Sequence, residues 1–279
     1  MRAFEIIKIG TNLLKEKKIS SSILDSELLL SKTLKKTREE VLINLDKKID
    51  EKDISVFKKY LYRRSKHEPI AYILGEKEFW SKKFQVNKHT LIPRPETELL
   101  VEELLKIFKE KRISILDIGT GSGCIIISLL SQLKGSYGEG IDISKEAILL
   151  AKNNSIKFNL TKKIKFFNKS FENIFGKKFD LIVSNPPYIE QKDIKNLSND
   201  IKKYEPRMAL DGGNDGLDLI KKIIYKSKEI LKINGMLALE IGNEQIKKVS
   251  KILVDNNFRI IEVIKDYKRN VRSVIACYK

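Results

Sequence analysis

The chain has 279 residues, a length that allows one large domain or two smaller ones, and 42% of them are hydrophobic, enough to form a buried core. No apolar run approaches the ~18 to 20 residues that a transmembrane helix needs, and the charged N-terminus does not resemble a signal peptide. Cys124 and Cys277 lack metal-ligand spacing. We therefore expect free thiols in a reducing, cytoplasmic compartment, with no metal site and no membrane association.

The formal net charge of +18 suits an acidic partner, such as nucleic acid or the surroundings of the ribosome. Lysine, however, outnumbers arginine 45 to 10, and the basic residues are spread along the whole chain. Such a pattern is also typical of genome composition bias. Two interpretations stay open: electrostatic attraction near the ribosome, with no direct DNA binding expected, or a purely compositional effect.

Residues 1–66 are predicted to form a small helical bundle. The stretches 22–25 and 37–40 resemble capping boxes that open two helices, and leucines recur at helical spacing after each of them. No catalytic constellation is visible in this region. Residues 67–92 are predicted to form a β-hairpin linker with its turn near Gly75, and a third region covers residues 93–279. Pro95 suits the first position of its opening helix.

Strands and helices alternate from about residue 113, which predicts a doubly wound α/β sheet with parallel strands. The predicted strands are 113–118, a second that ends at Asp142, 164–167, 179–184, 236–241, and a closing hairpin of 259–263 and 271–277.

A glycine-rich loop lies between the first strand and its helix. It consists of Gly119, Thr120, Gly121, Ser122 and Gly123. Its spacing matches neither a dinucleotide-binding loop nor a P-loop, and the acidic Asp117 argues against a polyphosphate ligand. Asp142 follows at the end of the second strand and can accept both hydroxyls of a ribose; its alternative role is a helix N-cap. A ligand with an adenosine end and a cationic end, such as S-adenosylmethionine, fits this pattern.

Four residues directly after the fourth strand form the most informative motif. They are Asn185, Pro186, Pro187 and Tyr188. The prolines end the strand because they cannot donate to its ladder, so the motif lies at the carboxyl edge of the sheet, where ligands bind. The side-chain oxygen of Asn185 and the carbonyl of Pro186 can accept two N–H groups, Pro187 offers no competing donor, and Tyr188 can pack on a flat group. The motif is suited to holding a planar NH2-bearing substrate.

Together, the loop, Asp142 and the 185–188 motif resemble class I S-adenosylmethionine-dependent amino-methyltransferases. Three further stretches, Leu-Ile-Pro-Arg-Pro-Glu-Thr-Glu at 91–98, 205–217 and Leu-Glu-Ile-Gly at 239–242, are similar to the HemK/PrmC family. Members of that family methylate the glutamine of the Gly-Gly-Gln motif in class I peptide chain release factors. The resemblance extends over essentially the whole chain.

The resemblance implies a class I, Rossmann-like methyltransferase domain over 93–279 and a substrate-recognition role for the helical domain 1–66. It implies S-adenosylmethionine as cofactor, with S-adenosylhomocysteine as product, held by the glycine loop, Asp142 and Asn185. The 185–188 motif would bind the substrate glutamine, with Asn185 and Pro186 as the catalytic groups. We expect Phe171 to stack on the adenine ring. Two alternatives stay open: Ser170 occupies that position, or Phe171 is a core residue.

Three other functions stay open at this point. A DNA or RNA adenine N6-methyltransferase would use the same motif on a flipped base, although no separate base-reading module is visible. A glutamine methyltransferase of a large-subunit ribosomal protein shares the motif as well. A helical binding module fused to a vestigial enzyme is the third, and the intact glycines, Asp142 and Asn185 argue against it.

Overall fold

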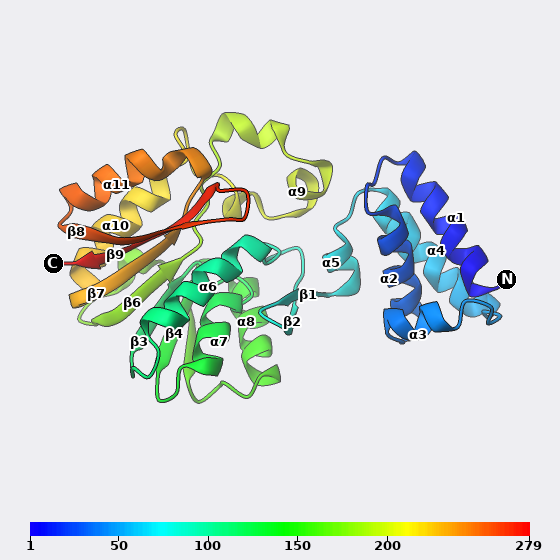
Figure 1. The fold of residues 1–279 in the computed structure, drawn as a ribbon, viewed down its shortest axis with the longest axis horizontal. Coiled ribbons are helices and arrows are strands. Elements are labelled where there is room, and N and C mark those ends of the chain that lie inside the picture. Colours follow the sequence, from blue (N-terminus) through cyan, green and yellow to red (C-terminus); the bar gives the residue numbers. More distant parts are fainter. The chain divides into compact units, whose positions relative to one another are not determined.

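The computed structural model describes residues 1–279, which divide into two compact units. The first unit comprises Met1–Glu76 together with Ser198–Tyr204, and the second comprises Lys77–Leu197 and Glu205–Lys279. Figure 1 labels the elements of both.

The first unit is helical, as predicted. Its core is formed by large apolar side chains that are almost completely buried, among them Leu14, Leu29, Leu30 and Phe57. Its helices are α1 (Ala3–Glu16), α2 (Ser22–Leu34), α3 (Arg38–Ile43), α4 (Glu51–Ser65), α5 (Ile70–Leu74) and α9 (Asn199–Tyr204).

The two predicted helix caps have different outcomes. Thr37 caps α3 as expected, because its hydroxyl accepts from the backbone N–H of Glu40 (3.2 Å) and its own N–H donates to the Glu40 carboxylate (2.7 Å). The cap predicted at Ser22 is wrong: α2 already begins there, one residue after Ser21. The Ser21 hydroxyl donates to the Asp25 carboxylate instead of capping the backbone.

The predicted hairpin linker is partly wrong. Its first part is helix α5, and Gly75, with φ +79°, ends that helix in the left-handed conformation. The hairpin consists of β1 (Glu76–Phe79) and β2 (Lys82–Gln85), with its turn at Trp80 and Ser81, which also have positive φ. A glycine with positive φ can end a helix or turn a hairpin, so the sequence signal at Gly75 fitted both structures.

The second unit contains a seven-stranded sheet in the order β5-β4-β3-β6-β7-β9-β8. All neighbouring strands are parallel except β9, which is antiparallel to β7 and to β8. This confirms the doubly wound sheet and the closing hairpin. The strands are β3 (Ser114–Ile118), β4 (Tyr137–Asp142), β5 (Ile164–Asn168), β6 (Phe179–Ser184), β7 (Leu231–Glu240), β8 (Phe258–Lys265) and β9 (Val271–Tyr278).

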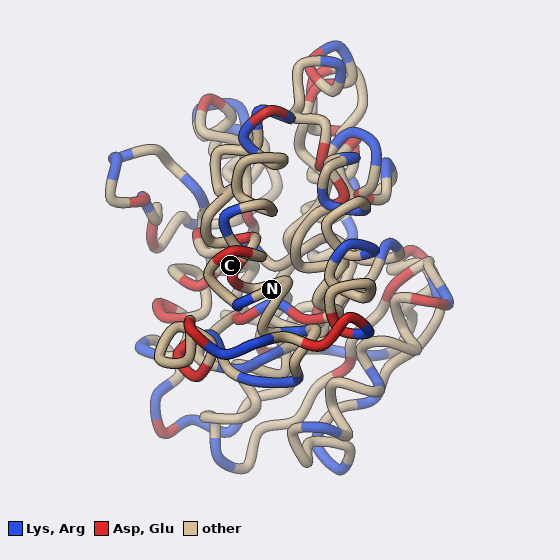
Figure 2. The backbone as a smooth tube through the Cα atoms, turned by 90° about the vertical axis from the view of Figure 1, so that its right-hand side faces the viewer, with Lys and Arg blue, Asp and Glu red and all other residues tan.

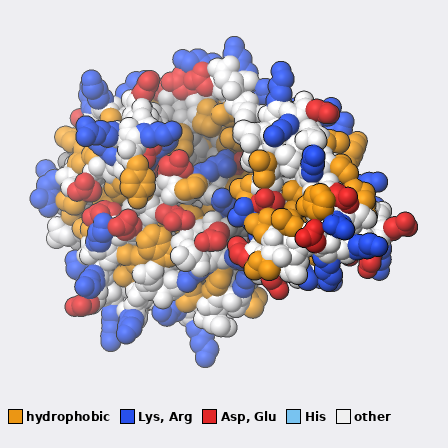
Figure 3. Space-filling model, turned by 45° about the vertical axis from the view of Figure 1, so that its right-hand side comes forward, with side chains coloured by type: hydrophobic (Ala, Val, Ile, Leu, Met, Phe, Trp, Pro, Cys, Tyr) orange, Lys and Arg blue, Asp and Glu red, His pale blue; other side chains and the backbone are white.

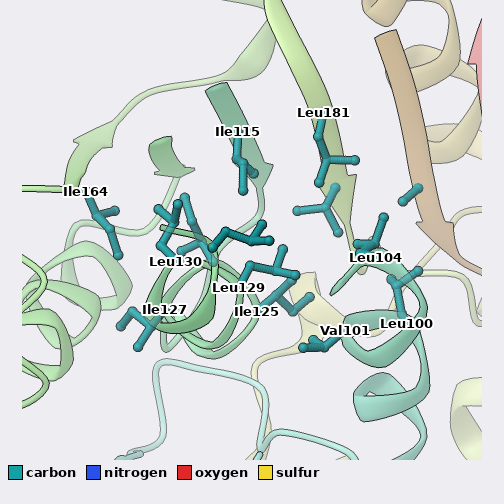
Figure 4. Close-up of a cluster of buried hydrophobic side chains, with 14 of the residues drawn as sticks. Leu100, Val101, Leu104, Ile115, Ile125, Ile127, Leu129, Leu130, Ile164 and Leu181 are labelled. Carbon is teal, nitrogen blue, oxygen red and sulfur yellow. The ribbon is translucent and has the colours of Figure 1, made fainter. Parts of the chain in front are cut away.

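Helices cover both faces of this sheet (Figure 1). On one face, Leu100 of α6 and Ile127 of α7 pack with Ile115; Figure 4 shows this cluster. On the other face, residues of α10 and α11 pack with Leu116, because successive strand side chains point to opposite faces. The helices are α6 (Pro95–Ile107), α7 (Cys124–Gln132), α8 (Lys145–Lys157), α10 (Asp218–Ile230), α11 (Ile246–Asp255) and the short 3₁₀ turns η1 (Phe171–Asn173), η2 (Gln191–Asn196), η3 (Arg207–Ala209) and η4 (Asn243–Gln245).

The strand order reverses between β3 and β6, since β3 continues to β4 on one side and β6 continues to β7 on the other. In open α/β sheets, ligands bind beyond the carboxyl ends of the strands at such a point. The glycine loop follows β3, Asp142 ends β4 and Asn185 follows β6. The topology therefore brings the three sequence motifs to one edge of the sheet.

Basic side chains are not gathered in one segment. Figure 2 shows lysine and arginine along the backbone throughout the chain, with acidic residues between them, and Figure 3 shows the same mixture on one face. No helix combines the length and the apolar character that crossing a bilayer requires.

Candidate active site

A cavity of about 490 Å³ lies in the second unit, within the range typical of small-molecule sites. Its wall combines the ends of β3, β4 and β6 with the segment that leads into α6. The wall includes Thr97, Gly119, Thr120, Gly121, Ser122, Asp142, Ile143, Ser170, Phe171, Asn185, Pro186 and Pro187. Most of the site residues predicted from the sequence therefore share one cavity.

The glycine loop borders open space on its cavity side. Gly119, Gly121 and Gly123 all have positive φ, at +70°, +55° and +80°. A Cβ atom on Gly119 would meet no heavy atom within 4 Å, whereas one on Gly123 would come within 2.9 Å of Ile127. Gly119 thus leaves room for a ligand. Gly123 is needed for packing at the start of α7 and does not line the cavity.

Asp142 braces the loop from the neighbouring strand. One carboxylate oxygen accepts from the backbone N–H of Gly121 (3.0 Å) and the other from that of Ser144 (2.9 Å). Burial raises the pKa of Asp142, and these N–H donors oppose the shift. The N-cap of α8 is Ser144, whose hydroxyl accepts from Ala147, so the N-cap alternative for Asp142 is wrong. Each carboxylate oxygen keeps a second lone pair for a ligand.

Asp117 lies behind the loop and not against the ligand space. It is 1% exposed, its Oδ2 accepts from the hydroxyl of Thr120 (2.7 Å), and its Oδ1 has no hydrogen-bond partner. Burial raises the pKa of Asp117 to about 7. Asp117 is therefore connected to the cavity wall through Thr120, which lines it.

The 185–188 motif divides between the cavity and the core. Asn185, Pro186 and Pro187 line the cavity, with Pro186 buried. Tyr188 is not part of the wall: its ring packs against the cluster under α10 and α11, and its hydroxyl donates to Glu240 Oε1 (3.2 Å). Burial raises the pKa of Tyr188. The expectation that Tyr188 packs on the substrate is not met in this arrangement.

Two buried residues behind Asn185 were missed by sequence reasoning. Thr97 of α6 accepts from the side-chain N–H of Asn185 (3.4 Å) and donates to Glu240 Oε2 (2.6 Å). Burial raises the pKa of Glu240, while the hydroxyls of Thr97 and Tyr188 favour its charged form. Both residues stand in stretches that carry the family resemblance, which was the signal available.

The adenine-stacking position has three candidates on the cavity wall. Phe171 and Ser170 both line it, although Phe171 is only 7% exposed and belongs to the core as well. Ile143 follows Asp142, is 63% exposed and also lines the cavity. An exposed apolar residue directly after the acidic end of a strand is the signal that could have identified it.

Comparison with known proteins covers both units. Residues 5–75 match the PrmC N-terminal domain, and residues 95–213 match the methyltransferase small domain. The release factor glutamine methyltransferase of Fusobacterium nucleatum is 41% identical over 279 residues, which cover 98% of this chain and 78% of that protein. The chain belongs to the release factor glutamine methyltransferase family.

Other relatives set the limits of this assignment. The bifunctional methyltransferase of Rickettsia felis is 40% identical over 92% of this chain, but the chain spans only about half, 54%, of that longer protein. The methyltransferase structure from Pyrococcus furiosus matches with a TM-score of 0.53 and 16% identity, over 79% of this chain and 96% of that one. That likeness concerns the fold alone, which is the class I methyltransferase fold.

The stretches typical of the family enclose the 185–188 motif in space. Glu205 is buried and accepts from Arg94 Nη2 (2.7 Å) and from the backbone N–H of Ile92 (3.2 Å), which joins the 91–98 and 205–217 stretches. Gln245 donates to the carbonyls of Tyr188 (2.9 Å) and Gly216 (3.2 Å). The Glu205 contacts thus tie the two family stretches to each other, and Gln245 holds the backbone at the last residue of the motif.

Proposed function

We propose that the chain transfers a methyl group from S-adenosylmethionine to the side-chain amide nitrogen of the glutamine in the Gly-Gly-Gln motif of class I peptide chain release factors. The products are N5-methylglutamine and S-adenosylhomocysteine. One observation carries the proposal: the glycine loop with Asp142 and the amide-holding residues Asn185 and Pro186 line the same cavity. Membership of the family supports the choice of glutamine as acceptor.

The residues present fit this cofactor. Open space above Gly119 admits a ligand close to the backbone, and the remaining lone pairs of Asp142 can accept the two ribose hydroxyls. Thr120, Gly121, Ser122 and Asn185 supply polar groups around it, and Phe171 or Ser170 borders its adenine end. When bound, S-adenosylmethionine supplies an electrophilic methyl group on a sulfonium.

The acceptor amide needs orientation more than a strong base. Its nitrogen is a poor nucleophile because the lone pair is delocalised into the carbonyl. Asn185 Oδ1 and the Pro186 carbonyl accept its two N–H groups, which aims the nitrogen at the cofactor and stabilises the positive charge that develops there. Pro187 adds no competing donor. With the cofactor bound, the amide nitrogen would take the methyl group as the C–S bond of the sulfonium breaks, and it would release one of the two protons that Asn185 and Pro186 hold.

The remaining assignments follow from the same proposal. Residues 1–66 recognise the release factor, residues 67–92 connect, and residues 93–279 carry the methyl transfer. The enzyme acts in the cytoplasm, where translation terminates. The net charge of +18 supports an attraction towards the acidic ribosome as one interpretation, beside a purely compositional one, and no direct DNA binding is expected.

The test is mass spectrometry of a release factor incubated with the chain and S-adenosylmethionine. We expect the Gly-Gly-Gln peptide to gain the mass of one methyl group on its glutamine, and a release factor with asparagine at that position to gain none. Duplex DNA and large-subunit ribosomal proteins, incubated in parallel with methyl-labelled cofactor, provide the competing acceptors. Label in either of these, with an unmodified release factor, would refute the proposal.

A further inference from the structure

A chain of hydrogen bonds leads from the cavity into the core of the second unit. Asn185 Nδ2 donates to Thr97 Oγ1 (3.4 Å), and Thr97 donates to Glu240 Oε2 (2.6 Å). The hydroxyl of Tyr188 donates to the other oxygen of Glu240 (3.2 Å). Asn185 belongs to the segment after β6, Thr97 to α6 and Glu240 to β7.

The direction of this chain is fixed by its buried end. Glu240 is 3% exposed and Thr97 is 2% exposed, so neither can turn to water for a partner. The hydroxyls of Thr97 and Tyr188 favour the charged form of Glu240 against the effect of burial on its pKa; in that form the carboxylate only accepts hydrogen bonds, and the 2.6 Å O···O distance lies in the range of charge-assisted bonds. The single proton of the Thr97 hydroxyl is therefore committed to Glu240, which leaves only lone pairs towards Asn185.

This commitment selects one orientation of the Asn185 amide. Because the Thr97 hydroxyl offers only lone pairs to Asn185, the amide must turn its NH2 group towards Thr97. Its Oδ1 atom is then free to face the cavity. With the amide reversed, two oxygens would face each other at Thr97 and an NH2 group would face the NH2 group of the substrate. Only the first orientation offers the acceptor that a glutamine amide requires.

We propose that Thr97 and Glu240 are positioning residues, which hold the Asn185 amide with its oxygen towards the acceptor nitrogen. This inference rests on the proposed function for the identity of that acceptor, but the orientation of Asn185 can be measured without any substrate. Tyr188 supports the same carboxylate from its other oxygen. The family motif thus contributes both the oriented amide, through Asn185, and part of its buried support, through Tyr188.

The kinetic test compares Thr97→Val with Thr97→Ser. Valine has the shape of threonine without the hydroxyl, whereas serine keeps it. We expect Thr97→Val to lower kcat on the release factor about 10-fold, the size of one net hydrogen bond, with the Kd for S-adenosylmethionine unchanged. Thr97→Ser retains turnover within about threefold, because its hydroxyl can make the same two bonds. Thr33→Val, at a buried threonine of α2, is the control for the effect of a buried methyl group on the free energy of unfolding.

The second measurement uses the protein alone. In ¹⁵N NMR spectra, the side-chain NH2 signals of Asn185 are assigned by their disappearance in Asn185→Ala. We expect these signals to shift in Thr97→Val and in Glu240→Gln, and to stay near the wild-type position in Thr97→Ser. Glu240→Gln is a second variant for the case in which Thr97→Val does not fold. It replaces one of the two carboxylate oxygens, which accept from Thr97 and Tyr188, by an NH2 group that can only donate.

Unchanged Asn185 signals in both Thr97→Val and Glu240→Gln would overturn the positioning role, whatever the substrate proves to be. Wild-type kcat in a folded Thr97→Val would overturn it as well. Shifted signals together with an unmodified release factor would instead leave the hydrogen-bond chain intact and refute the proposed acceptor. The two failures are therefore distinguishable.

Discussion

The two ends of the cavity are built in different ways. At the donor end, the glycine loop and Asp142 are 21 residues apart and come from adjacent strands, and their polar contacts are mostly with backbone N–H groups. At the acceptor end, which would hold the methyl acceptor, Asn185 donates to Thr97, which is 88 residues away in the sequence. Thr97 in turn donates to Glu240, which is 143 residues from Thr97. One end is local in sequence and the other is assembled by the fold.

This difference has a functional consequence. A backbone cradle needs little beyond glycine at the right positions and one carboxylate, so it tolerates change around it. An oriented side-chain amide needs every partner in its network, because a buried polar group that loses its partner keeps the full desolvation cost. We therefore expect substitutions at the acceptor end to affect turnover, and substitutions at the donor end to affect cofactor affinity.

The largest expected effect is at the acceptor end itself. Asn185→Ala removes the amide oxygen that accepts a hydrogen bond from the substrate. We expect turnover to fall about 100-fold to 1000-fold, which corresponds to ~3 to 4 kcal/mol in the barrier. Binding of S-adenosylmethionine, measured by calorimetry, should persist. Asn153→Ala, at an exposed asparagine of α8, is the matched control. Near-normal turnover in Asn185→Ala would remove the contrast between the two ends.

The corresponding change at the donor end is Asp142→Ala. It deletes the acceptor for the ribose hydroxyls and the brace on Gly121, and we expect the Kd for S-adenosylmethionine to rise about 10-fold to 100-fold. At saturating cofactor, kcat should recover. Calorimetry and cofactor-dependent kinetics measure the two quantities, with Glu102→Ala, an exposed carboxylate of α6, as control. A low kcat at saturation would show that the ends are not separable.

A further variant weakens the contact between the two family stretches, through Arg94, which also lines the cavity. Arg94→Met leaves the buried Glu205 carboxylate with the Ile92 N–H as its remaining partner. We expect the free energy of unfolding to fall by about 2 kcal/mol, measured by urea denaturation. The double variant Arg94→Met/Glu205→Gln should lose less than the sum of the single changes. Additive losses would mean that the pair does not couple the two stretches.

The last prediction concerns the pH dependence of stability. The pKa of Asp117 is raised by burial to about 7 in the folded protein, against 3.8 for the free group. The folded state therefore binds the proton more tightly, so the stabilisation is fully present below pH ~4 and is lost as the pH rises through about 7. The slope contributed by one such proton is at most about 1.4 kcal/mol per pH unit.

Asp117→Asn should flatten this part of the stability profile, since an amide does not titrate and can still accept from Thr120. Thermal unfolding between pH 5 and pH 8 compares the two proteins, with Asp193→Asn, at an exposed residue of η2, as control. Equal slopes in wild type and Asp117→Asn would mean that the buried carboxyl does not titrate in this range.

Predictions that rested on neighbouring residues were mostly confirmed. Glycines at the end of β3, an acid at the end of β4 and two prolines after β6 each leave a local mark, because backbone conformation and strand termination are decided within a few residues. At Gly75, however, the prediction from a local signal was wrong. The glycine has a positive φ as expected, but it ends helix α5 and does not form the hairpin turn.

By itself, the sequence determined the order of the strands in the second unit, the doubly wound sheet and which edge of it carries the candidate site. Only the tertiary structure decided which way the polar side chains face: Asp117 behind the loop, Tyr188 in the core, and Thr97 and Glu240 behind Asn185. The physical reason is that a side-chain hydrogen bond depends on distance in space. Residues that are far apart in the chain, such as Thr97 and Glu240, leave no common pattern along it.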